Sequence, residues 1–416
     1  MQIDLKLQHQ LLALETEHDV HAMIELTAPT LPADRDRTPL SLALVLDRSG
    51  SMSGEKLETV KRCAAYLVDQ LQPTDELAIV TFDDTVDLVV PLQQVQPGQM
   101  KAAIAGIHDG GMTNLSGGWL KGREELERTS ADGRARRVLL LTDGQANQGI
   151  TDRGQLTGLA SRTAAAGIGT TTIGYGADFD EQLLTDMADA GGGVGWFAET
   201  VDDAPRIFAE EFSGLVQLAA QNVSVEIRPT GPIEVIRVLN DYPSVGLSDG
   251  VQVQLGDAYA GQRLRFVFEL HVPELAALGP AKLAEVVVRY VTVGDTVEQH
   301  EVTYPLMVNL VSADEAATAI ADPDVTEEVT VLLAAKATED ARRLADEGDF
   351  DAARALLDDT TTTLRAMAAS SDRGEQLRKK ADDLEATAEF LAPGVHDAMN
   401  AKRMHYRASE MKRNRW

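Results

Sequence analysis

The chain has 416 residues, of which 44% are hydrophobic and 25% are charged, a balance that is ordinary for a globular protein with roughly two to four domains. Its formal net charge of −28 favours solubility and argues against nucleic acid or an anionic membrane as a general partner. The single cysteine, Cys63, excludes an internal disulfide, and no stretch reaches about 18 uninterrupted apolar residues, so we expect no membrane span. Because no secretory signal is visible at the N-terminus, the sequence predicts a cytoplasmic protein, although a chain trimmed of its signal would look the same.

The first 38 residues contain two predicted strands, residues 3–14 and 20–26, followed by a polar linker at 32–39. The first strand alternates partly between apolar and polar residues, as a half-buried strand does. We expect this segment, residues 1–38, to lie outside the domain that follows and to join a later β-sandwich.

The aliphatic run at 42–46 is too short for a core helix and predicts a buried strand. Three residues follow it in the spacing D-x-S-x-S, namely Asp47, Ser49 and Ser51, before a glycine-containing turn. A helix is predicted to begin near Gly54. The motif therefore lies at the carboxyl end of a strand, where open α/β sheets bind their ligands.

A second strand of the same kind, residues 138–142, ends in Asp143. If the two strands are parallel, their terminal carboxylates leave the sheet at the same edge. Between them lies a glycine-opened loop, residues 110–115, which could bring the hydroxyl of Thr113 into the same crevice. Two carboxylates and three hydroxyls are hard oxygen ligands, which suit Mg²⁺, Mn²⁺ or Ca²⁺ and not zinc.

In this order, the motif, the loop threonine and the later aspartate resemble the von Willebrand factor type A (VWA) domain with its metal-ion-dependent adhesion site (MIDAS), over about residues 39–217. The resemblance implies that Ser49, Ser51 and Thr113 hold the ion directly or nearly so. It also implies that Asp47 and Asp143 often act through water. Pairings of such a domain with a β-sandwich occur in bacterial multidomain proteins and in inter-α-trypsin inhibitor heavy chains.

A site of mostly neutral hydroxyls leaves the cation short of an anionic ligand, so a Glu or Asp from a partner protein would complete its octahedron. A plainer interpretation remains open for each residue separately. Asp47 could cap the following helix, Ser49 and Ser51 could satisfy turn amides, and Asp143 could cap a helix after Gly144.

Alternating strands and helices across 39–218 predict a doubly wound, mainly parallel sheet with helices on both faces and one antiparallel edge hairpin. Strands are predicted at 40–46, 76–82, 86–90, 138–142, 170–173 and 194–198. Helices are predicted at 55–71, 99–107, 116–127, 152–166, 180–190 and 202–218. The glycine cluster at 191–195 favours a helix-ending turn over a nucleotide loop, and the sequence has no phosphate-binding G-x-x-x-x-G-K-[ST] motif.

Residues 219–311 change to strands separated by Gly- and Pro-containing turns, which predicts an antiparallel β-sandwich. Its strands are predicted at 223–228, 233–239, 251–255, 263–272, 282–293 and 296–310. Because it has only about six strands of its own, it could recruit the N-terminal ones, which would leave the preceding domain inserted into a sandwich loop.

Residues 312–416 have a helical period and predict a small bundle, with helices at 325–347, 351–370 and 373–391 before a last helix or tail. The tail, 401–416, carries an excess of Lys and Arg. The tail could dock on the protein's own body or on an acidic partner, and we favour docking or a solvated end over nucleic-acid binding.

The leading functional hypothesis is a non-catalytic module that binds a partner protein through a divalent cation. The alternative is an accessory subunit of a ring-ATPase or chelatase-like machine, whose ATPase would lie in another chain. A metal-dependent hydrolase is the least favoured interpretation, because the motif offers hydroxyls where a two-metal hydrolase would place carboxylates and histidines.

Overall fold

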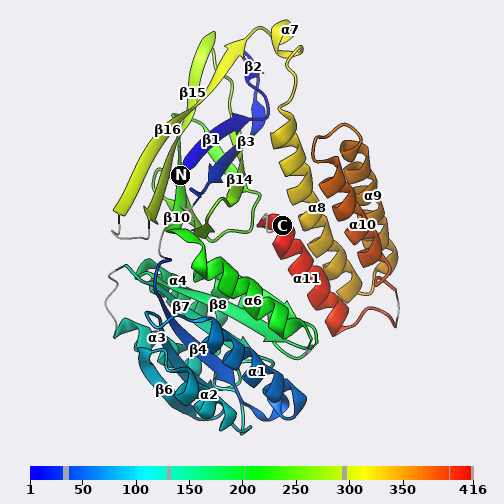
Figure 1. Cartoon of the computed structure of the whole chain (residues 1–416). Coiled ribbons are helices and arrows are strands. Elements are labelled where there is room, and N and C mark those ends of the chain that lie inside the picture. The colour runs from blue at the N-terminus through cyan, green and yellow to red at the C-terminus, as the bar shows by residue number, and fades with distance from the viewer. Residues whose placement is uncertain (31–36, 129–132, 201, 293–297, 393, 414–416) are drawn as a thin grey trace.

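A computed structural model describes the chain except residues 31–36, 129–132, 201, 293–297, 393 and 414–416. An α/β part lies at one end of the molecule, a β-sandwich lies at the other, and a group of helices runs beside both (Figure 1). Most of the predicted linker at 32–39 falls outside the described residues, as do the end of the basic tail and residues 293–297, where one predicted strand ends and the next begins.

The α/β part is built on a six-stranded sheet in the order β6-β5-β4-β7-β8-β9. All neighbouring strands are parallel except β6, which runs antiparallel to β5 at the edge. The bounds are β4 Leu40–Asp47, β5 Glu76–Phe82, β6 Val86–Gln94, β7 Ala135–Thr142, β8 Ile168–Tyr175 and β9 Gly192–Ala198. Every residue of the central strands β4, β7 and β8 is buried, as expected for parallel strands covered on both faces.

Helices cover both faces of this sheet, which confirms the predicted doubly wound α/β fold. One face packs against α1 Glu55–Gln70, α2 Pro97–Ala105 and α6 Asp203–Val216. The other packs against α3 Leu115–Glu127, α4 Arg153–Ala165 and α5 Glu181–Ala190. Helix α3 lies very close to the sheet, because a Cβ at Gly122 would lie 2.5 Å from Val45 Cγ2.

The sandwich consists of two sheets, in the orders β1-β3-β14-β11 and β12-β13-β10-β15-β16-β2, around one apolar core. Its N-terminal strands are β1 Gln2–Leu7, β2 Leu11–Ala13 and β3 His18–Thr27. The later strands are β10 Leu218–Pro229, β11 Glu234–Val238, β12 Ser244–Leu247, β13 Gly250–Tyr259, β14 Arg263–Val272, β15 Gly279–Thr292 and β16 Glu298–Val311. The chain leaves the sandwich after β3 and returns to it as β10, so the α/β part lies between two sandwich strands.

The predicted β-sandwich is confirmed and is mainly antiparallel, but it differs from the prediction in three details. Residues 3–14 do not form one strand, because β1 and β2 belong to different sheets. The sandwich is not wholly antiparallel, since β2 pairs in parallel with β16. Strand β12 was missed: it is a fully exposed edge strand of 4 residues, too short and too solvated to give a periodic signal.

The C-terminal helices are α7 Ala313–Ala316, α8 Pro323–Asp346, α9 Phe350–Ala368, α10 Gly374–Ala388 and α11 Ala398–Lys412. Helix α8 packs its first turns on the outer face of the four-stranded sheet, where Met23 and Val267 meet Val325 and Val329. None of the helices in the described parts of the chain is both long and apolar enough to cross a bilayer.

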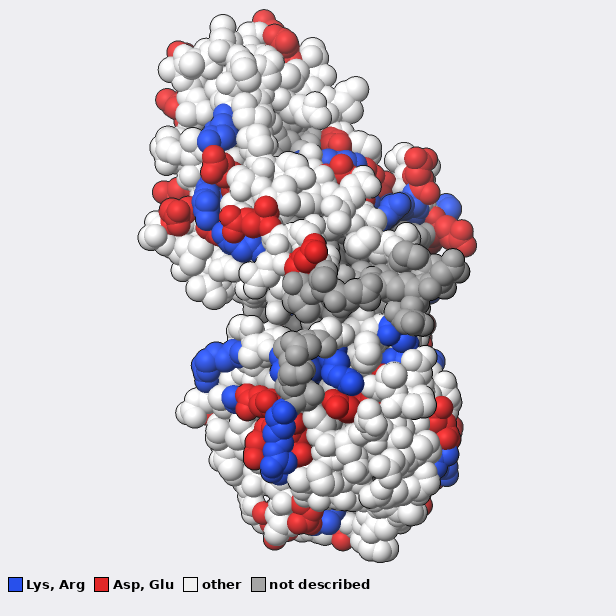
Figure 2. All heavy atoms as spheres, turned by 60° about the vertical axis from the view of Figure 1, so that its left-hand side comes forward, with Lys and Arg blue, Asp and Glu red and all other residues white. Residues whose placement is uncertain are grey.

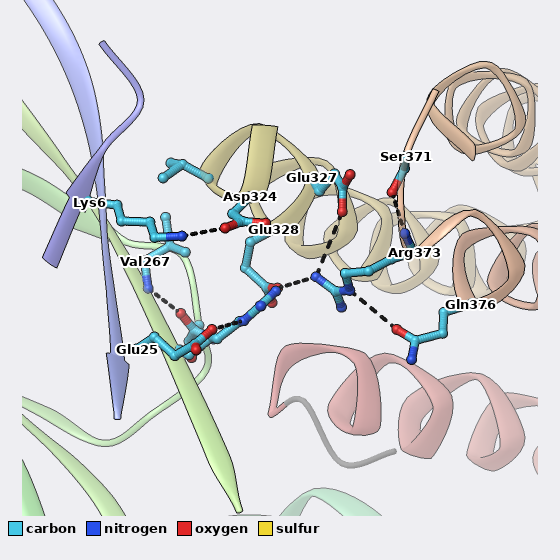
Figure 3. A network of polar contacts seen from close by, with 12 residues as sticks. Lys6, Glu25, Val267, Asp324, Glu327, Glu328, Ser371, Arg373 and Gln376 are labelled. Atoms are coloured by element: carbon cyan, nitrogen blue, oxygen red, sulfur yellow. Dashed lines mark hydrogen bonds and ion pairs between the residues drawn. The ribbon is translucent and has the colours of Figure 1, made fainter. Parts of the chain in front are cut away.

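A buried ionic network joins α8 to the sandwich and to α10 (Figure 3). Glu328 of α8 is fully buried, with its Oε2 3.1 Å from Arg265 Nη1 and 3.4 Å from Arg373 Nη1. Arg265 of β14 also donates to Glu25 of β3 at 2.7 Å. Because each guanidinium faces carboxylates here, the network fixes how the helices sit on the sheet.

The basic helix α11 docks on the α/β part and does not extend into solvent. Lys402 Nζ donates to Glu181 Oε2 at 2.6 Å, and Arg403 is ion-paired with Glu199. Tyr406 joins the apolar core between the sheet and helices α3 to α5, where its ring stacks on Phe197 with centroids 5.2 Å apart. Helix α11 thus connects the helical part directly to the α/β part (Figure 1).

Candidate metal centre

The segment after β4 turns sharply and keeps its first carboxylate inside the protein. A short 3₁₀ turn, Gly50–Met52, and the positive φ of 79° at Gly54 lead into α1. Asp47 is fully buried; its Oδ1 accepts the Ser49 amide at 2.7 Å, and its Oδ2 accepts the Thr142 hydroxyl. Burial raises the pKa of Asp47 to about 6, although these hydrogen bonds favour the charged carboxylate.

Hydrogen bonds connect the two serines of the motif to the second carboxylate. Ser49 Oγ and Ser51 Oγ lie 3.1 Å apart, and Ser51 Oγ donates to Asp143 Oδ1 at 2.6 Å. Asp143 follows β7, which pairs in parallel with β4. The parallel register therefore brings Asp47, Ser49, Ser51 and Asp143 to one edge of the sheet.

Thr113 reaches the same edge from the loop between α2 and α3. The loop is held on the motif by two backbone bonds, from Gly110 N to Arg48 O at 2.7 Å and from Gly50 N to Gly111 O at 3.0 Å. The Thr113 hydroxyl faces the segment after β7, since a Cβ at Gly144 would lie 3.0 Å from Thr113 Oγ1.

The chemistry of these side chains fits a hard divalent cation. Four of the five are buried: Asp47 and Asp143 are fully enclosed, Ser49 is 2% exposed and Thr113 4% exposed, whereas Ser51 is exposed. This group of side chains is therefore accessible to solvent at Ser51. All donors are oxygens, as Mg²⁺, Mn²⁺ and Ca²⁺ prefer. Within the described part of the chain no group of three or more His, Cys, Asp or Glu could hold a metal, so an ion at this edge would depend on the hydroxyls.

The capping and turn roles considered for single residues are only partly observed. Asp47 does bind a turn amide, but α1 has Gly54 at its N-cap and no side-chain cap. Asp143 caps no helix, because the next helix begins at Arg153 and is capped by Asp152. Met52, which follows Ser51 directly, is fully buried in the core.

Three further side chains contact the proposed ligands and were not identified from the sequence. Thr142 binds Asp47, Asn147 Oδ1 accepts the Thr113 amide at 3.0 Å, and Lys56 Nζ lies 2.5 Å from Asp143 Oδ2. One of them leaves a signal in the sequence. A lysine in the first turn of a helix opposes the helix dipole, so Lys56 indicates a nearby carboxylate.

Comparison with known proteins relates the α/β part to a wider family. Residues 41–210 match the family model of the von Willebrand factor type A domain. An uncharacterized protein, sll0103, from Synechocystis sp. is 30% identical over 270 residues, which cover 62% of this chain and 63% of that protein. The E3 ubiquitin-protein ligase WAV3 of Arabidopsis thaliana is 28% identical over 348 residues, 80% of this chain and 43% of that protein. The chain thus spans less than two thirds of the length of either relative.

Two solved structures resemble nearly the whole chain. The structure of a von Willebrand factor type A protein from Catenulispora acidiphila has a TM-score of 0.72 at 18% identity, covering 96% of this chain and 94% of that one. The ArnB paralog VWA2 from Sulfolobus acidocaldarius has a TM-score of 0.64 at 18% identity, covering 99% and 98%. At this identity the likeness concerns the fold, and it extends beyond the α/β part to the sandwich and the helices.

Proposed function

Because residues 41–210 form a von Willebrand factor type A domain, we propose that this chain is a non-catalytic module that binds a partner protein through a divalent cation. The proposed metal ligands are Asp47, Ser49, Ser51, Thr113 and Asp143. The proposed ion is Mg²⁺, with Mn²⁺ or Ca²⁺ as alternatives. The partner supplies an Asp or Glu carboxylate to the ion.

The observation that supports this proposal is the hydrogen-bonded chain Asp47–Ser49–Ser51–Asp143, which opens to solvent at Ser51. A bound cation would supply an electron-pair acceptor for a carboxylate from outside. Neutral hydroxyls offset little of its charge, so such a ligand set favours an added anionic group. The exposed rim next to Ser51 is where an acidic side chain would enter.

The carboxylates of the site already have partners, which supports a binding role over a catalytic one. Both oxygens of Asp47 accept hydrogen bonds, and both oxygens of Asp143 contact donors, Ser51 and Lys56. A carboxylate that is fully engaged in this way is poorly placed to take a proton from water as a general base. We therefore propose that the ion recruits a ligand and does not activate a nucleophile.

The surface charge supports a protein partner over a nucleic acid. Figure 2 shows Lys and Arg side chains interspersed with Asp and Glu over both the sandwich and the VWA domain, without a continuous basic stripe among the described residues of this face. A net charge of −28 would repel phosphate at long range. Carboxylate recognition in this protein would therefore be local to the bound cation.

Isothermal titration calorimetry tests the metal site. We expect the unmodified protein to bind Mg²⁺ or Mn²⁺, and Asp47→Ala to abolish binding. Ser51→Ala, at an exposed position that tolerates truncation, should weaken it by about tenfold, roughly the value of one charge-assisted contact. Asp69→Ala, which removes a surface carboxylate near the far end of α1, is the matched control and should bind like the unmodified protein. If neither metal binds to the unmodified protein, the proposal fails.

Co-purification from the native host tests the partner. A protein recovered with Mg²⁺ present, lost in EDTA and lost with Ser51→Ala would support carboxylate capture by the ion. Recovery of an ATPase would instead favour the alternative that the chain is an accessory subunit of a ring-ATPase or chelatase-like machine. Recovery that is unchanged in EDTA would contradict a metal-dependent interface.

A further inference from the structure

Lys56 places a positive charge of the protein itself on a carboxylate of the proposed metal site. It is the second residue of α1, and its Nζ lies 2.5 Å from Asp143 Oδ2. The lysine side chain is 32% exposed, whereas that of Asp143 is fully buried. The ammonium also lies 5.9 Å from the centre of the Tyr175 ring, over its face. The lysine thus reaches Asp143 from the solvent side and closes over it.

This arrangement is costly for the helix and favourable for the carboxylate. The N-terminus of α1 carries the positive end of the helix dipole, where a lysine is disfavoured. Asp143, in contrast, is a buried anion, which is strongly destabilising unless it is paired. Since Ser51 is a neutral donor to its other oxygen, Lys56 supplies the formal positive charge at this carboxylate.

The other positively charged side chain near the site, that of Arg48, is paired with carboxylates outside the proposed ligand set. Arg48 follows Asp47 directly, but its guanidinium pairs with Asp83 at 3.1 Å and with Asp87 at 2.6 Å. Those two carboxylates belong to the β5–β6 hairpin and not to the proposed ligand set. Lys56 is therefore the residue whose charge bears on the binding of an ion next to Asp143.

We propose that Lys56 competes with the divalent cation for Asp143 and so sets the metal affinity of the site. The inference rests on the proposed function, because it requires a cation among the five ligands. An ion entering there must displace the ammonium or accept its repulsion, so the site binds metal more weakly than its oxygens alone would. A partner carboxylate adds negative charge and offsets this penalty. Metal binding and partner binding therefore reinforce each other, and each raises the affinity for the other by the same factor.

Substitution of Lys56 tests the competition directly. We expect Lys56→Met to bind Mg²⁺ about tenfold more tightly than the unmodified protein by calorimetry, because it removes a like charge a few ångströms from the ion. Lys56→Arg keeps the charge and should bind with nearly unchanged affinity. Lys101→Met is the matched control, because it removes a lysine that is paired with Asp69 near the other end of α1. At 1.5 Å per helical residue, Asp69 lies about 20 Å from Lys56. Equal or weaker metal binding by Lys56→Met would overturn the proposal.

Loss of the lysine could destabilise the protein in EDTA, so a second variant and a variant-free measurement accompany the test. Lys56→Gln retains a donor to Asp143 without the charge and should also bind metal more tightly. In the unmodified protein, acylation of Lys56 followed by mass spectrometry should become faster when Mg²⁺ is added, while that of Lys101 stays constant. An unchanged rate at Lys56 would overturn the proposal even if neither variant folds. Failure of the unmodified protein to bind metal would instead remove the proposed function itself.

Discussion

At the scale of single residues, the site depends on a glycine that lets one loop approach another. A Cβ at Gly110 would lie 1.9 Å from Asp83 Oδ2. The Asp83 carboxylate cannot move away easily, because it accepts the Thr85 amide at 2.7 Å and pairs with Arg48. The loop that carries Thr113 would have to shift instead.

We therefore expect Gly110→Ala to lower metal affinity by about tenfold and the free energy of unfolding by roughly 1–3 kcal/mol, the usual cost of forcing a methyl group into a packed site. Calorimetric titration with Mg²⁺ and chemical denaturation measure the two effects.

Two other glycines provide controls for this prediction. A Cβ at Gly111 would also meet a carboxylate at 1.9 Å, but this one belongs to Asp84, which is exposed and can rotate into solvent. A Cβ at Gly98 in α2 would meet nothing within 4 Å. Gly111→Ala should therefore have a smaller effect than Gly110→Ala, and Gly98→Ala should leave metal binding unchanged. Equal effects at all three positions would show that loop approach does not limit the site.

The sequence predicts some residues of the site better than others, for a physical reason. Asp47 and Asp143 each end an aliphatic run, so their place at a common sheet edge follows from local pattern and the parallel pairing of β4 with β7. The contact of Thr142 with Asp47 depends on the register between these strands, and that of Lys56 depends on the direction of α1. Register and helix direction arise from packing across the whole domain, which a one-dimensional pattern does not encode.

At the scale of elements, the α/β part was predicted closely and the sandwich less so. Buried parallel strands such as β5 and amphipathic helices such as α1 carry long, strong patterns, and their observed bounds lie within one residue of the predicted ones. Strands β1 and β2 follow one another closely in the sequence, yet they join different sheets. Which sheet a short strand joins is decided by distant partners, here β3 and β16.

The docking of helix α11 has a predicted pH dependence. His405 is 6% exposed, and its Nε2 lies 2.9 Å from Thr185 Oγ1 of α5. Burial lowers the pKa of His405 from 6.5 to about 4. The charged groups that act on it are Arg342 of α8, Glu181 of α5, Asp241 after β11 and Lys412 of α11.

Because the folded-state pKa of His405 lies below the unfolded value, the unfolded chain binds more protons between about pH 6.5 and pH 4. The stabilisation from neutral His405 is complete above pH 6.5 and falls as the pH drops toward 4, by about 3 kcal/mol at most from this group. In the unmodified protein, the amides of α11 should lose protection from hydrogen exchange as the pH falls, after correction for intrinsic exchange rates. His405→Gln keeps a polar group beside Thr185 but cannot take up the proton, so its loss of protection between pH 6.5 and pH 4 should be smaller. Identical pH profiles would contradict the assignment.

At the scale of the whole molecule, the three parts are joined at several points and not only by the chain. Helix α8 rests on the sandwich through Glu328, while Arg342 near its other end donates to Glu181 of the VWA domain at 3.1 Å. Helix α11 packs along α8 (Figure 1). Its Tyr406 side chain belongs to the core of the VWA domain. The helices therefore link the sandwich to the VWA domain from the side, and a partner bound at the proposed metal site would engage a single assembly.

The direct junction between the VWA domain and the sandwich contains a buried ion pair. Arg137 of β7 is 1% exposed and pairs with Asp257 of β13. Glycines make room for the guanidinium: a Cβ at Gly193 would lie 2.6 Å from Arg137 Nη1, and a Cβ at Gly169 would lie 2.9 Å from its Cζ. This close fit indicates that the pair specifies how the two domains sit together.

Breaking this pair on one side should cost far more than removing both partners. We expect Arg137→Met to lower the free energy of unfolding by about 3–5 kcal/mol, because it leaves Asp257 buried without its counter-ion. Arg137→Met combined with Asp257→Leu should recover most of that loss, since no unpaired charge remains. Arg206→Met, which removes an exposed pair with Glu210 on α6, should cost about 0.5 kcal/mol or less. Chemical denaturation of all three measures the difference. A double variant as unstable as Arg137→Met would mean that packing around the guanidinium, and not its charge, holds the junction.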